Sequence, residues 1–198
     1  MNILISGIVP SPLAALVQKP KTHILETEQP FDVDFLKKNS IDFVISYRYR
    51  HRIRKPVIDY MKGNIINLHI SYLPFNRGAD PNLWSFLEDS AKGCSIHFID
   101  EGIDTGDLIV RRRIEFEAEG ETLASTYLKL NQEVIRLFDR EWPKILAGKS
   151  GRMKQPAGGT SHKLADRKCF EHLLSAKGWE TPVNELKGKA LGAGKRKR

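Results

Sequence analysis

Short apolar runs alternate with amphipathic segments along the N-terminal third of the chain. Short apolar runs predict buried strands, and apolar positions at helical spacing predict helices. The expected strands are Asn2–Ser6, Thr22–Thr27, Ile41–Ile45 and Ile65–His69, and the expected helices between them are Ser11–Val17, Phe31–Asn39 and Pro56–Met61. Strands that alternate with helices favour an α/β protein with a mostly parallel open sheet and flanking helices.

The pattern continues to about residue 150 and weakens beyond it. Further elements are expected as a helix at Pro81–Ser90, strands at Gly93–Ile99 and Leu108–Phe116, a long helix at Thr122–Leu146, a loop at Gln155–His162 and a short helix at Asp166–Ala176. The long helix carries an apolar stripe, interpreted as core or dimer contact, of Leu123, Tyr127, Leu130, Val134, Leu137, Phe138 and Ile145. We expect one domain over residues 1–150, an extension packed on it over residues 151–186, and a tail over residues 187–198.

Composition is that of an ordinary globular protein, with 40% hydrophobic and 28% charged residues. No apolar run is long enough to predict a membrane span, and the first residues lack the basic opening and long apolar core of a signal peptide. The two cysteines, Cys94 and Cys169, form neither a metal spacing nor a disulfide framework. We therefore expect no metal site and a cytoplasmic location.

The positive charge of the chain is concentrated at its C-terminal end. Six cations with no acid among them occupy the last dozen residues, namely Lys187, Lys189, Lys195, Arg196, Lys197 and Arg198. Subtracting these six from the net charge of +8 leaves +2 for residues 1–186. We expect the tail to be disordered and solvated, with nucleic-acid binding through it as the weaker alternative.

Polar side chains occur where a buried strand is expected to end. Asn67 and His69 lie two residues apart on that strand, so their side chains point to the same face. In parallel sheets ligands bind at the carboxyl ends of strands, and polar groups on an apolar face require a ligand or full hydrogen bonding. A satisfied polar pair that fixes the loop is the alternative reading, and for His97 a structural and a functional role are equally open.

Asp104 lies in the loop Gly102–Gly106, whose glycines allow unusual backbone angles and close approach of a ligand. If the strand before this loop lies beside the Asn67–His69 strand, Asp104 approaches His69. A carboxylate beside an imidazole raises the pKa of the imidazole and makes it a usable acid or base, and an amide donor beside it stabilises an oxyanion. No Ser or Cys has an evident activating base, so the residues favour direct transfer from a bound donor to a nucleophile, with Ser71 and Ser95 as hydrogen-bonding supports.

Several motifs occur together in this region: Asn67-x-His69-x-Ser71-x-Leu73-Pro74, Arg77-Gly78 followed by Pro81 and Trp84, Gly93-x-Ser95-Ile96-His97, and Asp100-Glu101-Gly102-Ile103-Asp104-Thr105-Gly106. In this combination they resemble the formyltransferases that use 10-formyltetrahydrofolate, which have a Rossmann-like sheet. The resemblance implies that Asn67 binds the formyl oxygen, that His69 donates a hydrogen bond or carries a proton, and that Asp104 orients His69 and helps remove the amine proton. It also implies a pterin site formed by Arg50, His51, Arg52, Ile53, Asp100, Glu101, Gly102 and Ile103.

The kind of acceptor is suggested by the short N-terminal half of the chain and by residues 73–81, whose sequence is a variant of the family's pattern. Both are most similar to those of the sugar-nucleotide N-formyltransferases of surface-polysaccharide biosynthesis. This resemblance implies that the acceptor is bound by Gly7, Ser11, Ser71, Arg77 and Gly78. Gly7 begins no full Gly-x-Gly-x-x-Gly pattern, so a standard dinucleotide site is not supported.

Other functions remain open from the sequence. Glycinamide ribonucleotide or another small amine is the alternative acceptor, and a catalytically silent folate-binding module is the alternative to an enzyme. Methionyl-tRNA formyltransferases carry an additional C-terminal domain for which residues 155–198 are too few. We expect small-molecule substrates and no membrane, with a homodimer left open.

Overall fold

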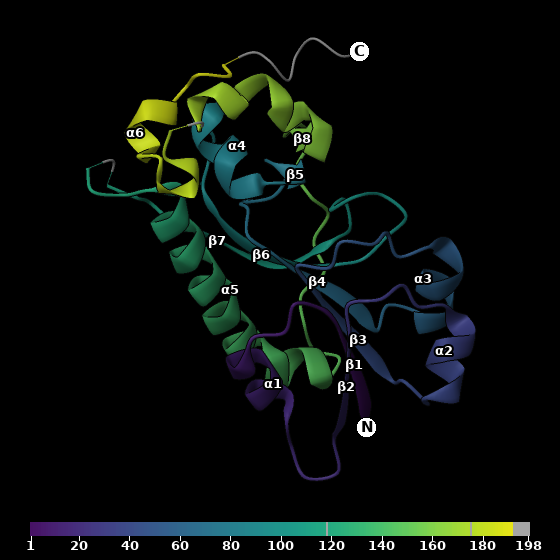
Figure 1. Cartoon of the computed structure of the whole chain (residues 1–198). Helices are drawn as coiled ribbons and strands as arrows, with labels where there is room; N and C mark the ends of the chain where they lie inside the picture. The colour runs from purple at the N-terminus through teal and green to yellow at the C-terminus, as the bar shows by residue number, and fades with distance from the viewer. Residues whose placement is uncertain (118, 175, 192–198) are drawn as a thin grey trace. The chain divides into compact units, whose positions relative to one another are not determined.

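The computed structural model of the chain describes residues 1–117, 119–174 and 176–191 (Figure 1). The strands are β1 Asn2–Gly7, β2 His23–Thr27, β3 Phe43–Tyr47, β4 Ile65–His69, β5 Arg77–Gly78, β6 Gly93–Phe98, β7 Leu108–Arg113 and β8 Ser161–His162. The α-helices are α1 Ser11–Val17, α2 Val33–Lys38, α3 Lys55–Met61, α4 Pro81–Leu87, α5 Leu123–Leu146 and α6 Val183–Leu186, and the 3₁₀ helices are η1 Leu164–Leu173 and η2 Gly178–Glu180.

Six of the strands form one sheet in the order β2-β1-β3-β4-β6-β7. The pairs β1–β2, β1–β3 and β3–β4 are parallel. The predicted α/β class with a mostly parallel open sheet is therefore confirmed. The prediction that Asp104 approaches His69 required the strand before the Asp104 loop to lie beside β4. That strand is β6, and it is next to β4 in the sheet.

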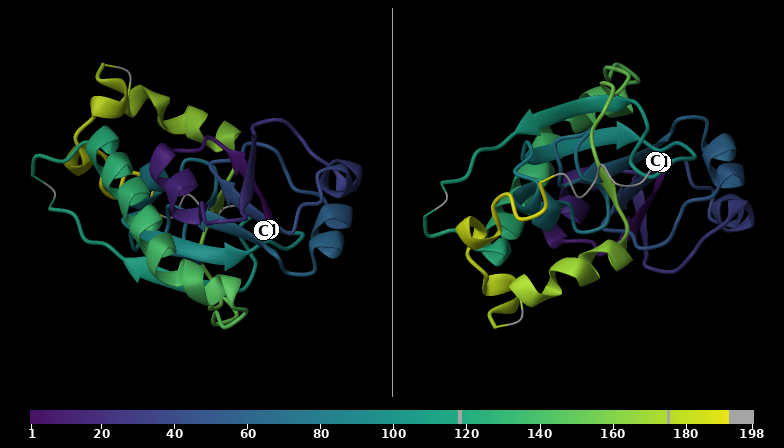
Figure 2. Two further views of the ribbon diagram at one scale, coloured as in Figure 1. Left: turned by 90° about the horizontal axis from the view of Figure 1, so that it is seen from below. Right: turned by 90° about the horizontal axis from the view of Figure 1, so that it is seen from above.

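The first of two compact units contains Met1–His69, Ile96–Val110 and Ile135–Lys154. Leu4, Val44 and Ile65 align across β1, β3 and β4 and pack with Leu36, Ile41, Val57 and Met61. Helices α2 and α3 thus lie side by side over this face, as Figures 1 and 2 show. The opposite face meets α5, where the rings of Phe43 and Trp142 lie 5.3 Å apart.

The second unit contains Ile70–Ser95, Arg111–Val134 and Gln155–Arg198. Its core joins α4, α5 and α6 through Leu83, Trp84, Phe86, Leu87, Leu123, Val183, Leu186 and Ala190. The short strands β5 and β8 pair in parallel, with Arg77 opposite Ser161 and Gly78 opposite His162. The stripe predicted on α5 is largely core, since all its members except Tyr127 are buried.

Several boundaries differ from the predictions for local reasons. The predicted strand Ile41–Ile45 is β3 Phe43–Tyr47, because the Ile41 amide bonds to the Leu36 carbonyl and closes the end of α2. Ser11 does not cap α1: the cap position is Pro10, and no side chain bonds there. The helix expected from Asp166 is the 3₁₀ helix η1, Leu164–Leu173.

The predicted basic tail falls only partly within the described residues. The amides of Gly188 and Ala190 donate to the carbonyls of Phe86 and Leu87 at 3.0 and 2.7 Å. Residues 187–191 are therefore ordered against α4, contrary to the expectation of disorder, and residues 192–198 lie outside the described residues. The division at residues 150 and 186 stays a prediction.

Within the described ranges, no helix is long and apolar enough to cross a membrane. Cys94 is fully buried, as expected of a small hydrophobic residue, and Cys169 is exposed. No group of three or more potential metal ligands occurs in the part of the chain that the structure describes.

Candidate active site

A row of polar side chains crosses the first unit at the carboxyl ends of three parallel strands. The sheet register aligns Ser6 with Ser46 and Ser46 with Asn67. On each strand the polar residue lies two positions after Leu4, Val44 or Ile65, the apolar residues that pack under α2 and α3. Because side chains two residues apart on a strand point to the same face, the polar row lies on that face as well. His69 continues that face at the end of β4. The sequence analysis found Asn67 and His69 and missed the two serines, since their alignment depends on strand register.

The loop after β6 brings Asp104 to this row. Asp104 has a left-handed backbone, with φ of 53°, whereas Gly102 and Gly106 do not. The glycines are needed for space: a Cβ on Gly102 would lie 1.9 Å from Thr105 Oγ1, and one on Gly106 would lie 1.9 Å from the Phe98 carbonyl oxygen. The expectation that these glycines supply unusual backbone angles is therefore wrong, and the strained position is that of the carboxylate itself.

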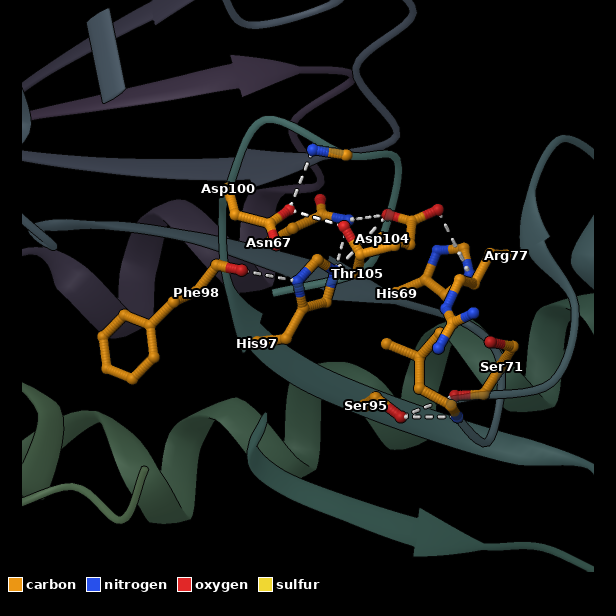
Figure 3. Close-up of polar contacts among 12 residues, drawn as sticks. Asn67, His69, Ser71, Arg77, Ser95, His97, Phe98, Asp100, Asp104 and Thr105 are labelled. Atoms are coloured by element: carbon orange, nitrogen blue, oxygen red, sulfur yellow. Dashed lines mark hydrogen bonds and ion pairs between the residues drawn. The ribbon is translucent and has the colours of Figure 1, made fainter. Parts of the chain in front are cut away.

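Asn67, His69, His97 and Asp104 converge at this point (Figure 3). Asn67 Nδ2 donates to Asp104 Oδ1 at 3.1 Å. His69 Nε2 lies 3.7 Å from Asp104 Oδ2, and His97 Nε2 lies 3.4 Å from Asp104 Oδ1. The structure thus brings together the three residues predicted to be catalytic and adds His97 to them.

His97 fixes the amide of Asn67. Its Nδ1 lies 2.8 Å from the Phe98 carbonyl oxygen, which only accepts hydrogen bonds, so Nδ1 carries a proton. In the neutral ring Nε2 is then an acceptor, and Asn67 Nδ2 lies 3.3 Å from it. Both hydrogens of the Asn67 amide are thereby directed to acceptors, at Asp104 and at His97. The sequence left the role of His97 open, because a single histidine on a strand carries no signal of its partners.

The cluster is largely shielded from water. His97 is 2% exposed and His69 is 8% exposed. The Asp104 side chain is 12% exposed. Electrostatic interactions in such a site are stronger than in water. The arrangement can hold a carboxylate, an imidazole and an amide around one reacting centre, which suits proton transfer and stabilisation of a developing negative charge.

Two loops predicted to hold a pterin lie against each other in the same unit. Arg52 Nη2 donates to the Glu101 carbonyl at 2.6 Å, and Lys55 Nζ lies 2.6 Å from Glu101 Oε1. Asp100 Oδ1 accepts from the Gly102 amide at 3.1 Å and from Thr105 Oγ1 at 2.7 Å, which orders the second loop. Arg52 of the first loop is therefore joined to Glu101 of the second, and the pterin site itself stays a prediction.

Local interactions shift the pKa of two groups near this surface. Burial raises the pKa of Tyr49, whose hydroxyl donates to the Gln29 carbonyl at 2.9 Å. Hydrogen bonds to Glu101 and Asp59 raise the pKa of Lys55, so this amine stays charged over the neutral range. Lys55, the first residue of α3, therefore keeps a positive charge beside Glu101.

The residues predicted to bind an acceptor fall in both units. In the first unit, a Cβ on Gly7 would lie 1.9 Å from the Tyr47 carbonyl oxygen, so the strand packing already explains this glycine. Ser11 is exposed at the start of α1. In the second unit, Ser95 Oγ donates to the Ser71 carbonyl at 2.7 Å and accepts from the Leu73 amide at 3.1 Å. Ser95 is thus the support that was predicted, whereas Ser71 Oγ is buried with no hydrogen-bond partner among the described residues.

Arg77 and Gly78 form β5 in the second unit. Gln155 Oε1 accepts from Arg77 Nε at 3.1 Å and from Nη2 at 2.8 Å. The Arg77 amide donates to the Thr160 carbonyl at 3.0 Å, and the Ala79 amide donates to the His162 carbonyl at 2.9 Å. The segment expected as a loop at Gln155–His162 is therefore ordered by backbone and side-chain bonds to residues 76–79.

A largely buried carboxylate, that of Glu88, holds this arrangement and was not predicted from the sequence. Glu88 Oε2 accepts from Thr160 Oγ1 at 2.8 Å and from Asn76 Nδ2 at 3.2 Å, and Glu88 Oε1 lies 3.1 Å from His162 Nε2. The Trp84 and His162 rings stack at 3.7 Å with an interplanar angle of 5°. No sequence pattern joins Glu88 to residues more than seventy positions away, so this network could not be foreseen.

Comparison with known proteins agrees with the fold and with the cluster. Residues 11–138, well over half of the chain, match the formyl transferase family. The chain belongs to the formyl transferase family. The formyltransferase PseJ from Anoxybacillus kamchatkensis, whose crystal structure is in complex with UDP-4,6-dideoxy-4-formamido-L-AltNAc and tetrahydrofolate, is 44% identical with a TM-score of 0.91. The match covers 96% of this chain and 100% of that chain.

Other relatives are more distant. The N-formyltransferase from Helicobacter canadensis, in complex with folinic acid and dTDP-3-aminofucose, is 16% identical with a TM-score of 0.70 over 97% of this chain and 81% of that chain, and therefore supports the fold alone. The methionyl-tRNA formyltransferase of Geobacter sulfurreducens is 31% identical over 75% of this chain and 48% of that protein. The corresponding protein of Clostridium tetani is 35% identical over 58% of this chain and 38% of that protein. The chain thus spans about half the length, or less, of these curated relatives.

Proposed function

We propose that the protein is an N-formyltransferase, which moves a formyl group from 10-formyltetrahydrofolate to the primary amine of a nucleotide-linked amino sugar. The observation that carries this proposal is the convergence of Asn67, His69 and Asp104 at the carboxyl ends of β4 and β6. The similarity to PseJ over nearly the whole chain supports both the donor and the class of acceptor.

The residues beside Asp104 fit a folate. Ile103, next to Asp104 in the chain, is 55% exposed, and a planar ring system placed on it would cover it. Residues 49–54 form neither helix nor strand, so their backbone groups are outside the sheet ladder and suit hydrogen bonding to a ring edge. When bound, 10-formyltetrahydrofolate would supply an activated formyl carbon next to His69 and Asp104.

The transfer exchanges one carbon–nitrogen bond for another. The acceptor nitrogen forms a bond to the formyl carbon, the bond from that carbon to N10 of the folate breaks, and the proton lost by the amine balances the proton gained at N10. Asp104 would receive the amine proton, and His69, within 3.7 Å of it, would carry a proton to or from the same centre. No covalent intermediate on the protein is needed.

The developing charge on the formyl oxygen requires hydrogen-bond donors. Both hydrogens of the Asn67 amide are directed to Asp104 and His97. To bind the oxygen, Asn67 would release one of these contacts, and the one to Asp104 Oδ1 is weakened when that carboxylate takes up a proton. Proton transfer to Asp104 and donation by Asn67 are therefore coupled in this proposal.

A panel of amines tests the proposal. Purified protein is incubated with 10-formyltetrahydrofolate and, separately, with a UDP-linked 4-amino-4,6-dideoxy sugar, glycinamide ribonucleotide and methionyl-tRNA, and formylated products are identified by mass spectrometry. We expect transfer to the sugar nucleotide with the highest kcat/KM. Methionyl-tRNA is included because the relatives from Geobacter sulfurreducens and Clostridium tetani are described as methionyl-tRNA formyltransferases. Folate binding without transfer to any amine would identify a silent binding module instead.

The cytoplasmic location, in which folate and sugar nucleotides are made, belongs to this proposal. A homodimer stays a prediction.

A further inference from the structure

Two serine hydroxyls are buried in the first unit, in the same row as Asn67. Ser6 is fully buried and Ser46 is 5% exposed. The Ser6 Oγ has no hydrogen-bond partner among the described residues. The Ser46 hydroxyl makes no hydrogen bond within these residues either. Burying a hydroxyl without a partner costs free energy, so both groups require an explanation.

The register of the sheet places these hydroxyls one strand apart. Ser6 on β1 aligns with Ser46 on β3, and Ser46 aligns with Asn67 on β4. Neighbouring strands lie about 4.8 Å apart, which is too far for a direct hydrogen bond between side chains that point the same way. One water molecule spans this separation, because it bonds to each of two oxygen atoms at about 2.8 Å.

The polar row also contains less side-chain volume than the apolar row before it. Leu4 and Val44 occupy the same face two positions earlier on β1 and β3. Serine is smaller than leucine or valine by roughly the size of a water molecule or more. Buried water molecules bond to polar groups that otherwise lack partners, which describes both hydroxyls of the row.

The amide oxygen of Asn67 completes the row. Asn67 Nδ2 is directed to Asp104 and His97, as Figure 3 shows. His97 lies on β6, and β4 separates β6 from β3 in the sheet. The oxygen is on the other branch of the planar amide and therefore turns to the side on which Ser46 lies. It accepts no hydrogen bond within the described part of the chain.

We infer that ordered water bridges Ser6 to Ser46 and Ser46 to Asn67 Oδ1, and that Ser46 is thereby a positioning residue for formyl transfer. A water bound to Oδ1 holds the plane of the amide while Nδ2 exchanges Asp104 for the formyl oxygen. It also polarises the amide, which strengthens Nδ2 as a donor. The effect on turnover rests on the proposed function, whereas the bridging water does not.

Ser46→Ala removes the hydroxyl next to Asn67 in the row. We expect kcat to fall by about five- to tenfold, which is the effect of one net hydrogen bond. The KM of each substrate should stay within about twofold of wild type, because the bridging water contacts neither substrate. Steady-state transfer from 10-formyltetrahydrofolate to the UDP-linked amino sugar measures both quantities.

A double-mutant cycle with Asn67→Ala separates positioning from a general structural effect. If Ser46 acts through Asn67, adding Ser46→Ala to Asn67→Ala should change the single-turnover rate by less than about twofold. Ser85→Ala is the matched control. Ser85 is 3% exposed in the second unit, where its Oγ donates to the Asn82 carbonyl at 2.8 Å. This control should leave kcat within about twofold of wild type.

Ser6→Ala tests the bridging water without turnover. Removal of a buried hydroxyl that has no partner stabilises a protein, whereas removal of one that holds a water destabilises it. We expect the urea midpoint of Ser6→Ala to lie below that of wild type, with kcat within about twofold. A crystal structure that shows ordered water should place a molecule between Ser46 Oγ and Asn67 Oδ1.

The outcomes separate the claims. Wild-type kcat in Ser46→Ala, or an equal loss with and without Asn67, would overturn the positioning role. A urea midpoint of Ser6→Ala above that of wild type, or a crystal structure without the water between Ser46 and Asn67, would overturn the bridge. Absence of transfer to every amine of the panel would contradict the proposed function and the positioning role with it, while the urea midpoint and the crystal structure would still decide the bridge.

Discussion

Two largely buried carboxylates in this protein, those of Glu88 and Asp104, each lie beside an imidazole and an asparagine, yet their contacts differ. Glu88 in the second unit accepts hydrogen bonds from Thr160 Oγ1 at 2.8 Å and Asn76 Nδ2 at 3.2 Å, and His162 Nε2 lies 3.1 Å from it without the geometry of a hydrogen bond. Asp104 in the first unit has a hydrogen bond of 3.1 Å from Asn67, but His69 lies 3.7 Å away, beyond hydrogen-bond range. The nearest distance between the carboxylate and the imidazole of this pair is thus 3.1 Å at Glu88 and His162 and 3.7 Å at Asp104 and His69.

The backbone shows the same difference. The residues that contact Glu88 lie in or next to β5 and β8, and these two strands are also joined by main-chain hydrogen bonds. Asp104 lies on a loop with a left-handed backbone at the carboxyl ends of the parallel strands, where ligands bind in such sheets. We therefore expect the Glu88 network to stabilise the fold and the Asp104 cluster to serve the proposed chemistry.

The largest expected effect is that of His69→Ala. Loss of a positioned acid–base group lowers kcat by about two to four decades. The variant should still unfold in one cooperative transition, so that the loss of kcat is measured on folded protein. Steady-state formyl transfer and thermal unfolding check both parts. A variant with near wild-type kcat would contradict the assignment of the cluster.

The next effect concerns stability rather than turnover. Glu88→Gln removes the charge that faces His162 and weakens its bonds with Thr160 and Asn76, so we expect the free energy of unfolding to fall by about 3 kcal/mol. Urea denaturation measures this, and kcat of the folded fraction should stay within about threefold of wild type. A hundredfold loss of kcat without loss of stability would contradict the expectation that Glu88 stabilises the fold and takes no part in the reaction.

A smaller effect on turnover is expected from His97→Ala. His97 acts through Asn67, whose amide it holds at 3.3 Å, so its loss should lower kcat by about tenfold to a hundredfold, less than the loss of His69. His97→Gln, which keeps an acceptor near Asn67, should recover part of this loss. A purely structural His97 would lower stability and leave kcat of both variants unchanged.

The smallest effect is expected at the rim of the Glu88 network. Ser90 Oγ donates to Asn76 Oδ1 at 2.8 Å, and Ser90→Ala removes this single bond. The free energy of unfolding should fall by about 1 kcal/mol, with no change in kcat. Combining Ser90→Ala with Glu88→Gln tests the network: a joint loss smaller than the sum indicates coupling, whereas strict additivity would show two independent bonds.

The sequence predicted the Asp104 cluster because its members lie on or just after strands with clear apolar patterns. Asn67 and His69 share a strand face by spacing alone, and the motif around Asp104 is continuous in sequence. Adjacent pairing of β4 and β6 was an assumption that the sheet order confirmed. The fold class and the convergence of these three side chains could thus be predicted from the sequence, and their catalytic role stays a prediction.

The remainder depends on contacts that no local pattern encodes. The partner of His97 depends on strand register, and the ligands of Glu88 come from residues far along the chain. Ser11 looked like a helix cap but begins α1 as its first residue, because Pro10 already occupies the cap position. The glycines beside Asp104 were expected to adopt unusual backbone angles, but they instead leave space for Thr105 and Phe98.

The most direct test of the account is a single-turnover measurement of formyl transfer with Asp104→Asn and Glu88→Gln side by side. Excess folded protein is mixed with limiting 10-formyltetrahydrofolate and saturating UDP-linked amino sugar, and the rate of product formation is recorded. We expect Asp104→Asn to be slower than wild type by about two to four decades and Glu88→Gln to be within about threefold of it. Equal rates for the two variants, or a fast Asp104→Asn, would contradict the claim that the Asp104 cluster performs the chemistry.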